Sequence, residues 1–337
     1  SIVRQHTEMP AVLGTWSQVL DERVQGRLGT IEPESLKLAL IEANSGGKRV
    51  RPLLSLWFGS CLGVEMERLL PVACLTEWLH SAFLIHDDIQ DGDIWRRDRP
   101  TLWKSHGIPT ALNAADWLLS AVYREISSIS LDPSSRIRIL DAVSDVHRRT
   151  VVGQQFDLSG RADPSFSLQR YEELVRSKTG RYLALGMVCV AIVKGLDDGV
   201  VDTLWNVGDQ LGPAFQIQDD LLDLTKGKGR GGEMGNDIRE GKPSILFAHS
   251  LQSSAMTDAD KSRLVSIMDR SREETSTTDI QECIEIFDKC GSIEFAKAEA
   301  RSRSAQGLGI FSDIDELSPV IKAEFESICE YLTERNR

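Results

Sequence analysis

The stretch Phe83-Leu84-Ile85-His86-Asp87-Asp88-Ile89-Gln90-Asp91 runs from apolar residues straight into three carboxylates. On a helix, residues four apart share a face, so Asp87 and Asp91 would project together with Asp88 beside them. Three like charges this close repel one another, and something positive must compensate them. Carboxylate oxygens suit a hard cation such as Mg²⁺, which usually shares its remaining positions with water and substrate phosphates. Taken alone, the cluster also fits a solvated helix face.

The same pattern recurs downstream in Phe215-Gln216-Ile217-Gln218-Asp219-Asp220-Leu221-Leu222-Asp223. Asp219 and Asp223 are one helical turn apart, and the two leucines between them would be out of place on a solvated face. Two such clusters, each on an otherwise apolar helix, argue against solvated faces. We therefore expect the two helices to form two walls of one site for a metal ion and a diphosphate.

Composition predicts a soluble globular protein. The 337 residues are 41% hydrophobic and 27% charged, which is ordinary for this class, and the length allows one large domain. The net charge of −12 argues against nucleic acid or an anionic membrane as the main partner. Positive charge is concentrated in Lys48-Arg49-Val50-Arg51 and Arg96-Arg97-Asp98-Arg99. We predict a single domain over residues 1–337.

The cysteines and the apolar runs indicate a cytoplasmic location. The six cysteines show no spacing typical of metal ligands and mostly sit among apolar residues, where a reduced thiol behaves as a small apolar side chain. The start, Ser1-Ile2-Val3-Arg4, does not read as a secretory signal. The longest apolar run, residues 183–193, is too short to span a bilayer, so we expect no transmembrane segment.

Periodicity predicts helices throughout. Gly46 and Gly47 form a turn that feeds cations into a new helix, so Lys48 and Arg51 are expected to share a face. Pro71 is expected to open the long helix of the first acidic motif, and further helices are expected over 134–158, 171–193 and 200–224, followed by a flap over 225–241. No segment alternates with period two, and the glycines of residues 227–232 lack the strand-then-helix context of a P-loop. The predicted fold is an all-α bundle with its site between facing helices.

The motifs GGKRVRP, HDDIQD, RRDRPT, GQQFD, KTG, FQIQDD and NDIREGKPS follow one another between Gly46 and Ser244. With these motifs in this order, the chain resembles the trans-isoprenyl diphosphate synthases. The resemblance implies the terpenoid-synthase fold, a large orthogonal helical bundle with a central cavity, and a homodimer. It also implies that isopentenyl diphosphate is condensed with dimethylallyl, geranyl or farnesyl diphosphate to a linear all-trans prenyl diphosphate, with Mg²⁺ stabilising the leaving pyrophosphate.

The resemblance also implies a role for each matching residue. The metal ligands would be Asp87, Asp88 and Asp91 of the first motif and Asp219, Asp220 and Asp223 of the second. Isopentenyl diphosphate would be held by Lys48, Arg51, His80 and Arg97. The allylic diphosphate would be held by Arg96, Lys178 and Lys242, with Thr179 and Gln216 near the cation that forms. Gln155 and Asp157 would lie behind these groups as polar support.

One position departs from the family pattern. A lysine commonly lies four residues before the Asp that Asp237 matches, and here that position is Glu233. Lys226, Lys228 or Arg230 could take over its contact, or the allylic site could close differently.

Product length is predicted from the two positions before the first motif. In the family, bulky residues five and four positions before the first Asp stop chain growth early. Here those positions hold the small Ala82 and the bulky Phe83. This combination favours geranylgeranyl diphosphate as the product, with farnesyl diphosphate and then longer polyprenyl diphosphates as alternatives.

Two other functions remain open from the sequence. A class I terpene cyclase also ionises allylic diphosphates, but it normally carries an Asn/Ser/Glu metal motif on the second helix and needs no second diphosphate pocket. A non-catalytic regulatory subunit of a prenyl synthase tends to lose one acidic motif, and both are intact here. We therefore predict an enzyme.

Overall fold

The computed structural model describes residues 9–225 and 233–334. The chain divides into two compact units, each described by itself below. The first unit holds the described residues up to His147, Leu183–Trp205, and the segment that begins at Phe311. The second holds Arg148–Tyr182 and Asn206–Ile310. The single domain over residues 1–337 stays a prediction.

Within the described ranges, one short hairpin is the only strand structure, and the all-α prediction is confirmed. The helices and strands, in chain order, are α1 (Ala11–Gly14), α2 (Ser17–Leu28), α3 (Glu34–Ala43), α4 (Val50–Cys61), α5 (Met66–Asp91), β1 (Trp95–Arg96), β2 (Arg99–Pro100), α6 (Leu102–His106), α7 (Ile108–Ser128), α8 (Pro133–Gly160), α9 (Leu168–Val175), the π-helix η1 (Arg176–Gly180), α10 (Arg181–Lys194), α11 (Asp198–Leu222), α12 (Asn236–Arg239), α13 (Ile245–Gln252), α14 (Asp258–Met268), the 3₁₀-helix η2 (Arg272–Glu274), α15 (Thr277–Lys289), α16 (Ser292–Ser312) and α17 (Pro319–Glu334).

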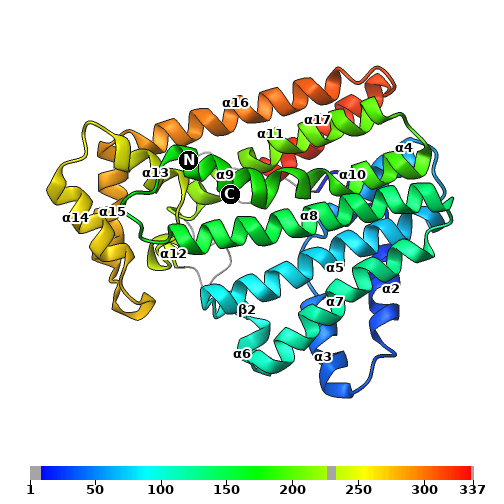
Figure 1. The fold of residues 1–337 in the computed structure, drawn as a ribbon, viewed down its shortest axis with the longest axis horizontal. Coiled ribbons are helices and arrows are strands. Elements are labelled where there is room, and N and C mark those ends of the chain that lie inside the picture. The colour runs from blue at the N-terminus through cyan, green and yellow to red at the C-terminus, as the bar shows by residue number, and fades with distance from the viewer. Residues whose placement is uncertain (1–8, 226–232, 335–337) are drawn as a thin grey trace. The chain divides into compact units, whose positions relative to one another are not determined.

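Helix α5 is the centre of the first unit. It runs beside α7 and packs against α4 as well (Figure 1). Most of its length is buried, because it is apolar on nearly every face, as expected of a helix surrounded by others. The rings of Trp78 on α5 and Trp117 on α7 meet edge to face with centroids 5.9 Å apart. The first acidic motif is thus carried on a helix fixed along most of its length.

The predicted start of this helix was wrong. Helix α5 begins at Met66, with Glu65 as its N-cap, and Pro71 lies inside it. A proline removes one backbone hydrogen bond and crowds the preceding turn, but only about one turn of helix precedes Pro71 here. The other end follows the sequence: Gly92 takes the left-handed conformation at φ 68° and terminates the helix directly after Asp91.

The second unit has its own apolar core. Its contributors come from α9, α11, α13, α14, α15 and α16, with Phe166, Phe247, Phe287 and Leu264 among the buried side chains. Helices α14 and α15 lie side by side in this unit (Figure 1). Both begin with a capping box, formed by Thr257 with Asp260 and by Ser276 with Asp279.

The continuous helix predicted over residues 171–193 is interrupted. Helix α9 ends at Val175, the five residues of η1 follow in π-helical geometry, and α10 begins at Arg181. A π-turn adds one residue to a helical turn and is frequent at functional sites. Hydrophobic periodicity did not show it, because α9 is amphipathic whereas α10 is apolar on nearly every face, so α10 has no apolar stripe that would reveal a shift of register.

One described helix, α5, is long and apolar enough to cross a membrane by length and composition alone. Of the most apolar 18-residue stretch of that helix, 78% is buried inside the protein, and the core helices of soluble proteins are buried in the same way.

Candidate active site

The first acidic motif separates into two kinds of carboxylate. Asp87 and Asp91 are half-buried on one face of α5, whereas Asp88 is 4% exposed. Arg96 from β1 donates to both oxygens of Asp88, with Nε 2.9 Å from Oδ2 and Nη2 2.6 Å from Oδ1. A bidentate pair of this kind fixes both side chains. Arg96 therefore supplies a positive partner for Asp88, one of the three carboxylates.

The hairpin that carries Arg96 presents a second arginine. Strands β1 and β2 are joined by Arg97 and Asp98, both at positive φ (50° and 59°), as in the tight turns that match the twist of a hairpin. The Arg97 guanidinium lies against the backbone of Gly47, where an added Cβ would be 2.6 Å from its Cζ. A side chain at residue 47 would displace the Arg97 guanidinium from this position.

The glycine turn before α4 corrects one prediction. Gly46, Gly47 and Arg49 all have positive φ, and α4 begins only at Val50. Lys48 therefore precedes the helix and does not share a helical face with Arg51. The Lys48 ammonium lies 5.3 Å from the ring centre of Tyr331 on α17.

Arg51 and His80 come together, with Arg51 Nη1 3.4 Å from His80 Nε2. One turn before His80, Glu77 is 7% exposed. Burial raises the pKa of Glu77, and the charges of Arg49, Arg97 and Arg51 act against that rise. Sequence reasoning did not single out Glu77, although a carboxylate one turn from His80 on an apolar helix is a readable signal. These residues form one cationic cluster around a buried acid.

A cavity of about 240 Å³ lies between the glycine turn, α5 and the hairpin. Arg96, Arg97 and Arg99 line it from the hairpin, and Asp88 and Ser81 line it from α5. The Ser81 hydroxyl donates to Asn44 Oδ1 at 2.9 Å, which ties the residue before the glycine turn to α5. This cavity is lined by three arginines, the kind of side chain that an anionic group requires.

In the second unit, the predicted lysines share one carboxylate. Lys178 Nζ in η1 donates to Gln154 Oε1 at 2.9 Å and to Asp157 Oδ2 at 3.1 Å, both on α8. Asp157 is 1% exposed. Burial alone would raise its pKa, but Lys178, Lys242 and Arg161 together hold the pKa at about 2. The structure thus brings Lys178 and Lys242 to the same buried acid.

Gln155 is a correction. It was expected beside Asp157, yet it is exposed and its amide donates to Ser159 at 3.4 Å. Residues 154 and 157 are three apart on α8 and share a face, whereas residue 155 points elsewhere. Gln154 takes the expected place, and this helical spacing could have identified it.

The carboxylates of the second motif also differ in surroundings. Asp219 is half-buried, whereas Asp220 and Asp223 are 2% and 0% exposed. Asp220 accepts hydrogen bonds from Gln216 Nε2 at 3.0 Å and from the Tyr171 hydroxyl at 3.3 Å. Nothing in the sequence marked Tyr171 as a partner of this motif.

Asp223 holds the last part of the predicted flap, of which residues 226–232 lie outside the described residues. Its Oδ2 accepts from the backbone N–H of Asp237 at 2.9 Å, and its carbonyl accepts from that of Gly235 at 2.8 Å. The Asp237 carbonyl in turn accepts from the backbone N–H of Lys242 at 2.8 Å. The last carboxylate of the motif is therefore connected through α12 to Lys242.

Glu233 is exposed, and its carboxylate lies 3.9 Å from Arg239 Nε. Lys226, Lys228 and Arg230, the residues considered as substitutes for the missing lysine, lie outside the described residues. The Glu233 carboxylate thus forms an ion pair with an arginine of the same segment.

The two positions predicted to set product length are both buried on α5. Ala82 is 0% exposed and Phe83 is 7% exposed. The Phe83 ring packs against the imidazole of His147 on α8, with centroids 5.7 Å apart. His147 Nδ1 lies 2.8 Å from the hydroxyl of Tyr123 on α7. Phe83 is therefore backed by two further rings in the first unit.

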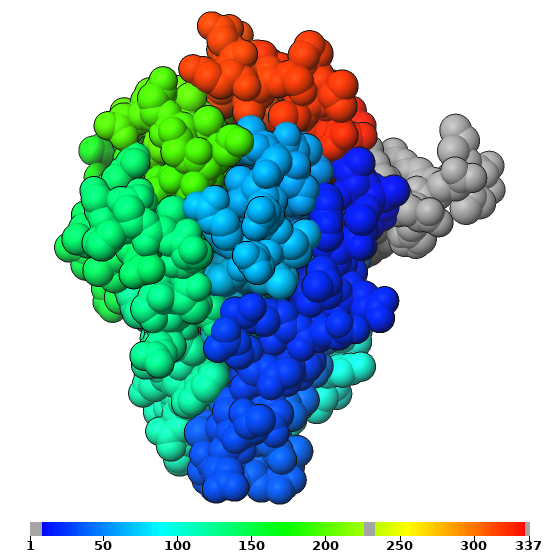
Figure 2. Space-filling model, turned by 90° about the vertical axis from the view of Figure 1, so that its right-hand side faces the viewer, coloured from blue at the N-terminus to red at the C-terminus, as the bar shows by residue number. Residues whose placement is uncertain are grey.

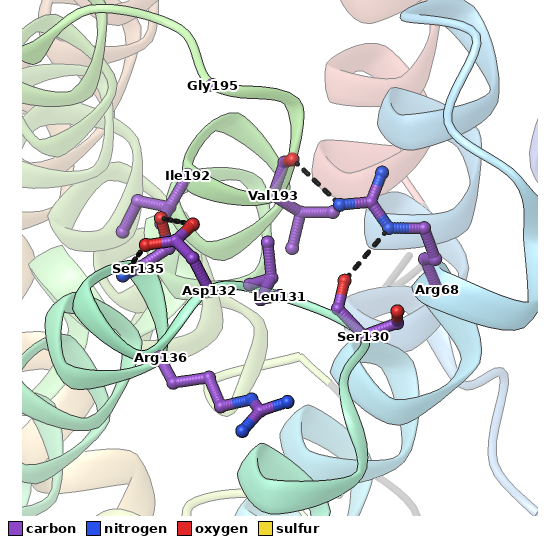
Figure 3. Close-up of a pocket in the computed structure, with 9 residues that line it drawn as sticks. All are labelled: Arg68, Ser130, Leu131, Asp132, Ser135, Arg136, Ile192, Val193 and Gly195. Carbon is purple, nitrogen blue, oxygen red and sulfur yellow. Dashed lines mark hydrogen bonds between the residues drawn. The ribbon is translucent and has the colours of Figure 1, made fainter.

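A second cavity, of about 460 Å³, holds none of the predicted site residues. Figure 3 shows Arg68 donating to the carbonyl oxygens of Ser130 (3.2 Å) and Val193 (3.3 Å), which joins α5, the α7–α8 connection and α10. The start of α5 and the α7–α8 connection adjoin on the face shown in Figure 2. Asp132 accepts hydrogen bonds from the backbone N–H and the hydroxyl of Ser135. The polar groups of this cavity thus stabilise the local structure.

Comparison with known proteins identifies the family of the chain. Residues 34–287 match the family model described as polyprenyl synthetase. A geranylgeranyl pyrophosphate synthase of Geoglobus acetivorans is 32% identical over 95% of this chain and 97% of that protein. A short chain isoprenyl diphosphate synthase of Methanothermobacter thermautotrophicus is 32% identical over 87% and 89%.

The fold agrees as well. The crystal structure of geranylgeranyl pyrophosphate synthetase from Pyrococcus horikoshii superimposes with a TM-score of 0.86 at 26% identity, over 96% of this chain and 98% of that one. The motifs, the all-α fold of the isoprenyl synthases and the matching residues lead to one conclusion. The chain belongs to the polyprenyl synthetase family and is an isoprenyl diphosphate synthase, a trans-prenyltransferase.

Proposed function

We propose that this enzyme condenses isopentenyl diphosphate with an allylic diphosphate (dimethylallyl, geranyl or farnesyl) and releases geranylgeranyl diphosphate as its main product. The observation that carries the proposal is that each unit holds its own cationic cluster. Arg51, His80 and Arg97 lie in the first, and Lys178 and Lys242 lie in the second. A condensing enzyme must hold two diphosphates, whereas a terpene cyclase holds one.

The allylic diphosphate is assigned to Arg96, Lys178 and Lys242. Departure of pyrophosphate leaves an allylic cation, and groups aimed at the developing charge stabilise it most in a site from which water is excluded. Thr179 and Gln216 are assigned to the side of the cation. Isopentenyl diphosphate is assigned to Lys48, Arg51, His80 and Arg97, and the released pyrophosphate is the base for the final proton loss.

We propose Mg²⁺ as the metal. Asp87 and Asp91 fit it because both are half-buried carboxylates one turn apart, and oxygen donors suit this ion. Asp219 is their counterpart on the second motif, and Asp88, Asp220 and Asp223 support them through hydrogen bonds to protein groups. When bound, the metal would act as a Lewis acid toward the leaving pyrophosphate. We also propose that the two acidic motifs face each other across one site.

The product length follows from the buried aromatic group on α5. Phe83 is about 6 Å along the helix from Asp87, at 1.5 Å per residue, so a growing tail that lies along α5 meets its ring early. Ala82 beside it leaves space that a larger residue would fill. Farnesyl diphosphate and longer polyprenyl diphosphates are the alternative products.

A homodimer is the proposed assembly. In the first unit, Ile108 and Leu112 on α7 and Ile137 and Leu140 on α8 are large apolar side chains that are 41–57% exposed. Each pair is spaced three or four residues apart and so lies on one helical face. Exposed apolar faces of this kind are typical of interfaces between subunits. The cytoplasm is the proposed location, where six reduced cysteines are expected.

The test is an assay of the purified enzyme with Mg²⁺, isopentenyl diphosphate and each allylic diphosphate, with EDTA as control. Dephosphorylated products are sized by mass spectrometry. We expect metal-dependent linear prenols with the C20 alcohol most abundant. Consumption of the allylic diphosphate without incorporation of isopentenyl diphosphate would indicate a cyclase instead. No turnover with any primer would indicate the regulatory-subunit alternative.

A further inference from the structure

The π-helix η1 determines where two predicted catalytic groups point. It contains Lys178 and Thr179, and its extra residue shifts the register between α9 and α10. One residue of an α-helix corresponds to a rotation of about 100°. If η1 became an ordinary α-helical turn, Lys178 would rotate relative to one of the two flanking helices. It would then lose its hydrogen bonds to Gln154 and Asp157.

Two glycines from different helices press on consecutive residues of this turn. A Cβ built on Gly153 of α8 would lie 2.7 Å from the backbone nitrogen and 2.8 Å from the Cα of Lys178. A Cβ on Gly212 of α11 would lie 2.4 Å from the carbonyl oxygen of Thr179 and 2.8 Å from the Cα of Gly180. These obstacles are backbone atoms, so no rotation of a side chain could relieve either contact.

Other glycines show that such contact is not general. An added Cβ on Gly309, which lies exposed on α16, would meet nothing within 4 Å. On Gly59 of α4 it would meet only the side chain of Leu69, at 2.1 Å. Gly241 also meets a backbone atom, the Met268 carbonyl oxygen at 2.6 Å. Gly153 and Gly212 differ from it in that both meet the backbone of one turn, the turn that carries Lys178 and Thr179.

We propose that Gly153 and Gly212 are positioning residues for the reaction: they allow α8 and α11 to approach η1 so closely that its extra residue, and with it the direction of Lys178 and Thr179, is fixed. The proposal rests on the proposed function only in assigning Lys178 and Thr179 to the allylic substrate.

The contacts of Lys178 support a role beyond packing. Its two hydrogen-bond acceptors, Gln154 and Asp157, lie on the same helix as Gly153, and Gln154 is the next residue. The distance between α8 and η1 therefore sets the position of the Lys178 ammonium as well. A side chain at residue 153 would push the lysine backbone away from both acceptors at once.

The test compares Gly153→Ala and Gly212→Ala with two control variants. Gly309→Ala adds a methyl group in open space, and Gly59→Ala adds one against a side chain in the other unit. For each variant, the melting temperature, the kinetic constants for both substrates and the dissociation constant of an unreactive allylic thiodiphosphate are measured. The variants at residues 153 and 212 are also combined with Lys178→Ala.

Because a misplacement of about 1 Å can cost about 100-fold, we expect Gly153→Ala and Gly212→Ala to lower kcat/KM for the allylic substrate by about that factor. We expect KM for isopentenyl diphosphate to stay within about twofold. Combined with Lys178→Ala, each should add little further loss, because both changes act on one group. Gly59→Ala should lower the melting temperature without affecting the allylic substrate more than isopentenyl diphosphate. Gly309→Ala should resemble wild type.

The proposal is overturned if the glycine variants weaken both substrates equally, or if their losses add fully to that of Lys178→Ala. Should Gly212→Ala not fold, Gly153→Ala carries the test, because its closest contact is 2.7 Å rather than 2.4 Å. A wild-type enzyme that fails to bind the thiodiphosphate would instead refute the assignment of the allylic site, which separates the two hypotheses.

Discussion

Asp157 is the residue on which the positive charges of the second unit converge. Its carboxylate is buried, accepts from Lys178, and is paired with Arg161 at 3.1 Å. A buried carboxylate is costly unless it is paired, and here the pairing outweighs the cost of burial, since the pKa falls from 3.8 to about 2. Asp157 thus holds like charges close together at the proposed allylic site.

Replacing Asp157 should therefore reduce stability in a pH-dependent way. At pH 7 we expect Asp157→Asn to lower the free energy of unfolding by about 2 to 3 kcal/mol, from a shift of about 1.8 pKa units at about 1.4 kcal/mol each. Because the folded pKa is depressed, the wild-type advantage is present above about pH 4 and is lost as pH falls toward 2. Urea denaturation of both proteins at several pH values checks this. A difference that stays constant down to pH 2 would contradict it.

Phe83 gives a prediction about the product. We expect Phe83→Ala to lengthen the product by one or more isoprene units, because a space replaces the ring that meets the growing tail. Products from geranyl diphosphate are sized by mass spectrometry, with Trp117→Phe as the control for a change in a neighbouring aromatic pair. If Phe83→Ala gives the wild-type distribution, the assignment of the tunnel to this face of α5 is wrong.

Single residues were predictable from the sequence where one motif contains the whole interaction. The spacing of Asp87 and Asp91 placed both on one face, and the structure confirms that they share α5. Tyr171 and Glu77 were missed because each acts with partners far along the chain. The pairing of Asp88 with Arg96 depends on the tight turn at Arg97 and Asp98, which the sequence did not specify.

At the scale of elements, the end of α11 divides its carboxylates between two tasks. Asp219 is half-buried, whereas Asp223 accepts the Asp237 N–H and so connects α11 to α12. An asparagine at residue 223 keeps an oxygen acceptor for that N–H but removes the charge. The same change at residue 219 removes a charged oxygen from the proposed metal site.

We therefore expect the two asparagine variants to differ. Asp219→Asn should lower kcat by about 100-fold or more, because electrostatic stabilisation of the leaving group is lost. Asp223→Asn should stay within about fivefold of wild type, whereas Asp223→Ala should raise KM for the allylic substrate by loosening the segment before Lys242. Kinetics over a range of Mg²⁺ concentrations distinguish the roles. An equal rise in metal requirement for both asparagine variants would show that Asp223 also binds the metal.

The elements themselves were predictable where periodicity and end signals agree. Gly92 ends α5 directly after its motif, as glycine in the left-handed conformation commonly does. Pro71 misled, because a proline near the start of a helix is tolerated both at its first residue and one turn inside. The π-turn could not be predicted, since it depends on close approach by glycines on two other helices.

At the scale of the whole molecule, the chain places one acidic motif and one cationic cluster in each compact unit. The sequence predicted the two acidic motifs, because they recur with the same spacing, but not the division of the chain into two units. Assembly is the remaining question at this scale, and the exposed apolar side chains of α7 and α8 give it a definite test. On the left of Figure 2, residues of these two helices form the surface of the first unit.

We expect the double substitution Ile137→Asp with Leu140→Asp to convert a dimer into a monomer. Both side chains lie on one face of α8 and are 57% and 41% exposed. Aspartates there cost little in a monomer, whereas burying them against a second copy would leave unpaired charges. Sedimentation velocity or light scattering measures the mass. Val320→Asp on α17, where Val320 is 64% exposed, is the matched control and should leave the mass unchanged. If the control dissociates the dimer and the double variant does not, the interface lies on α17 instead.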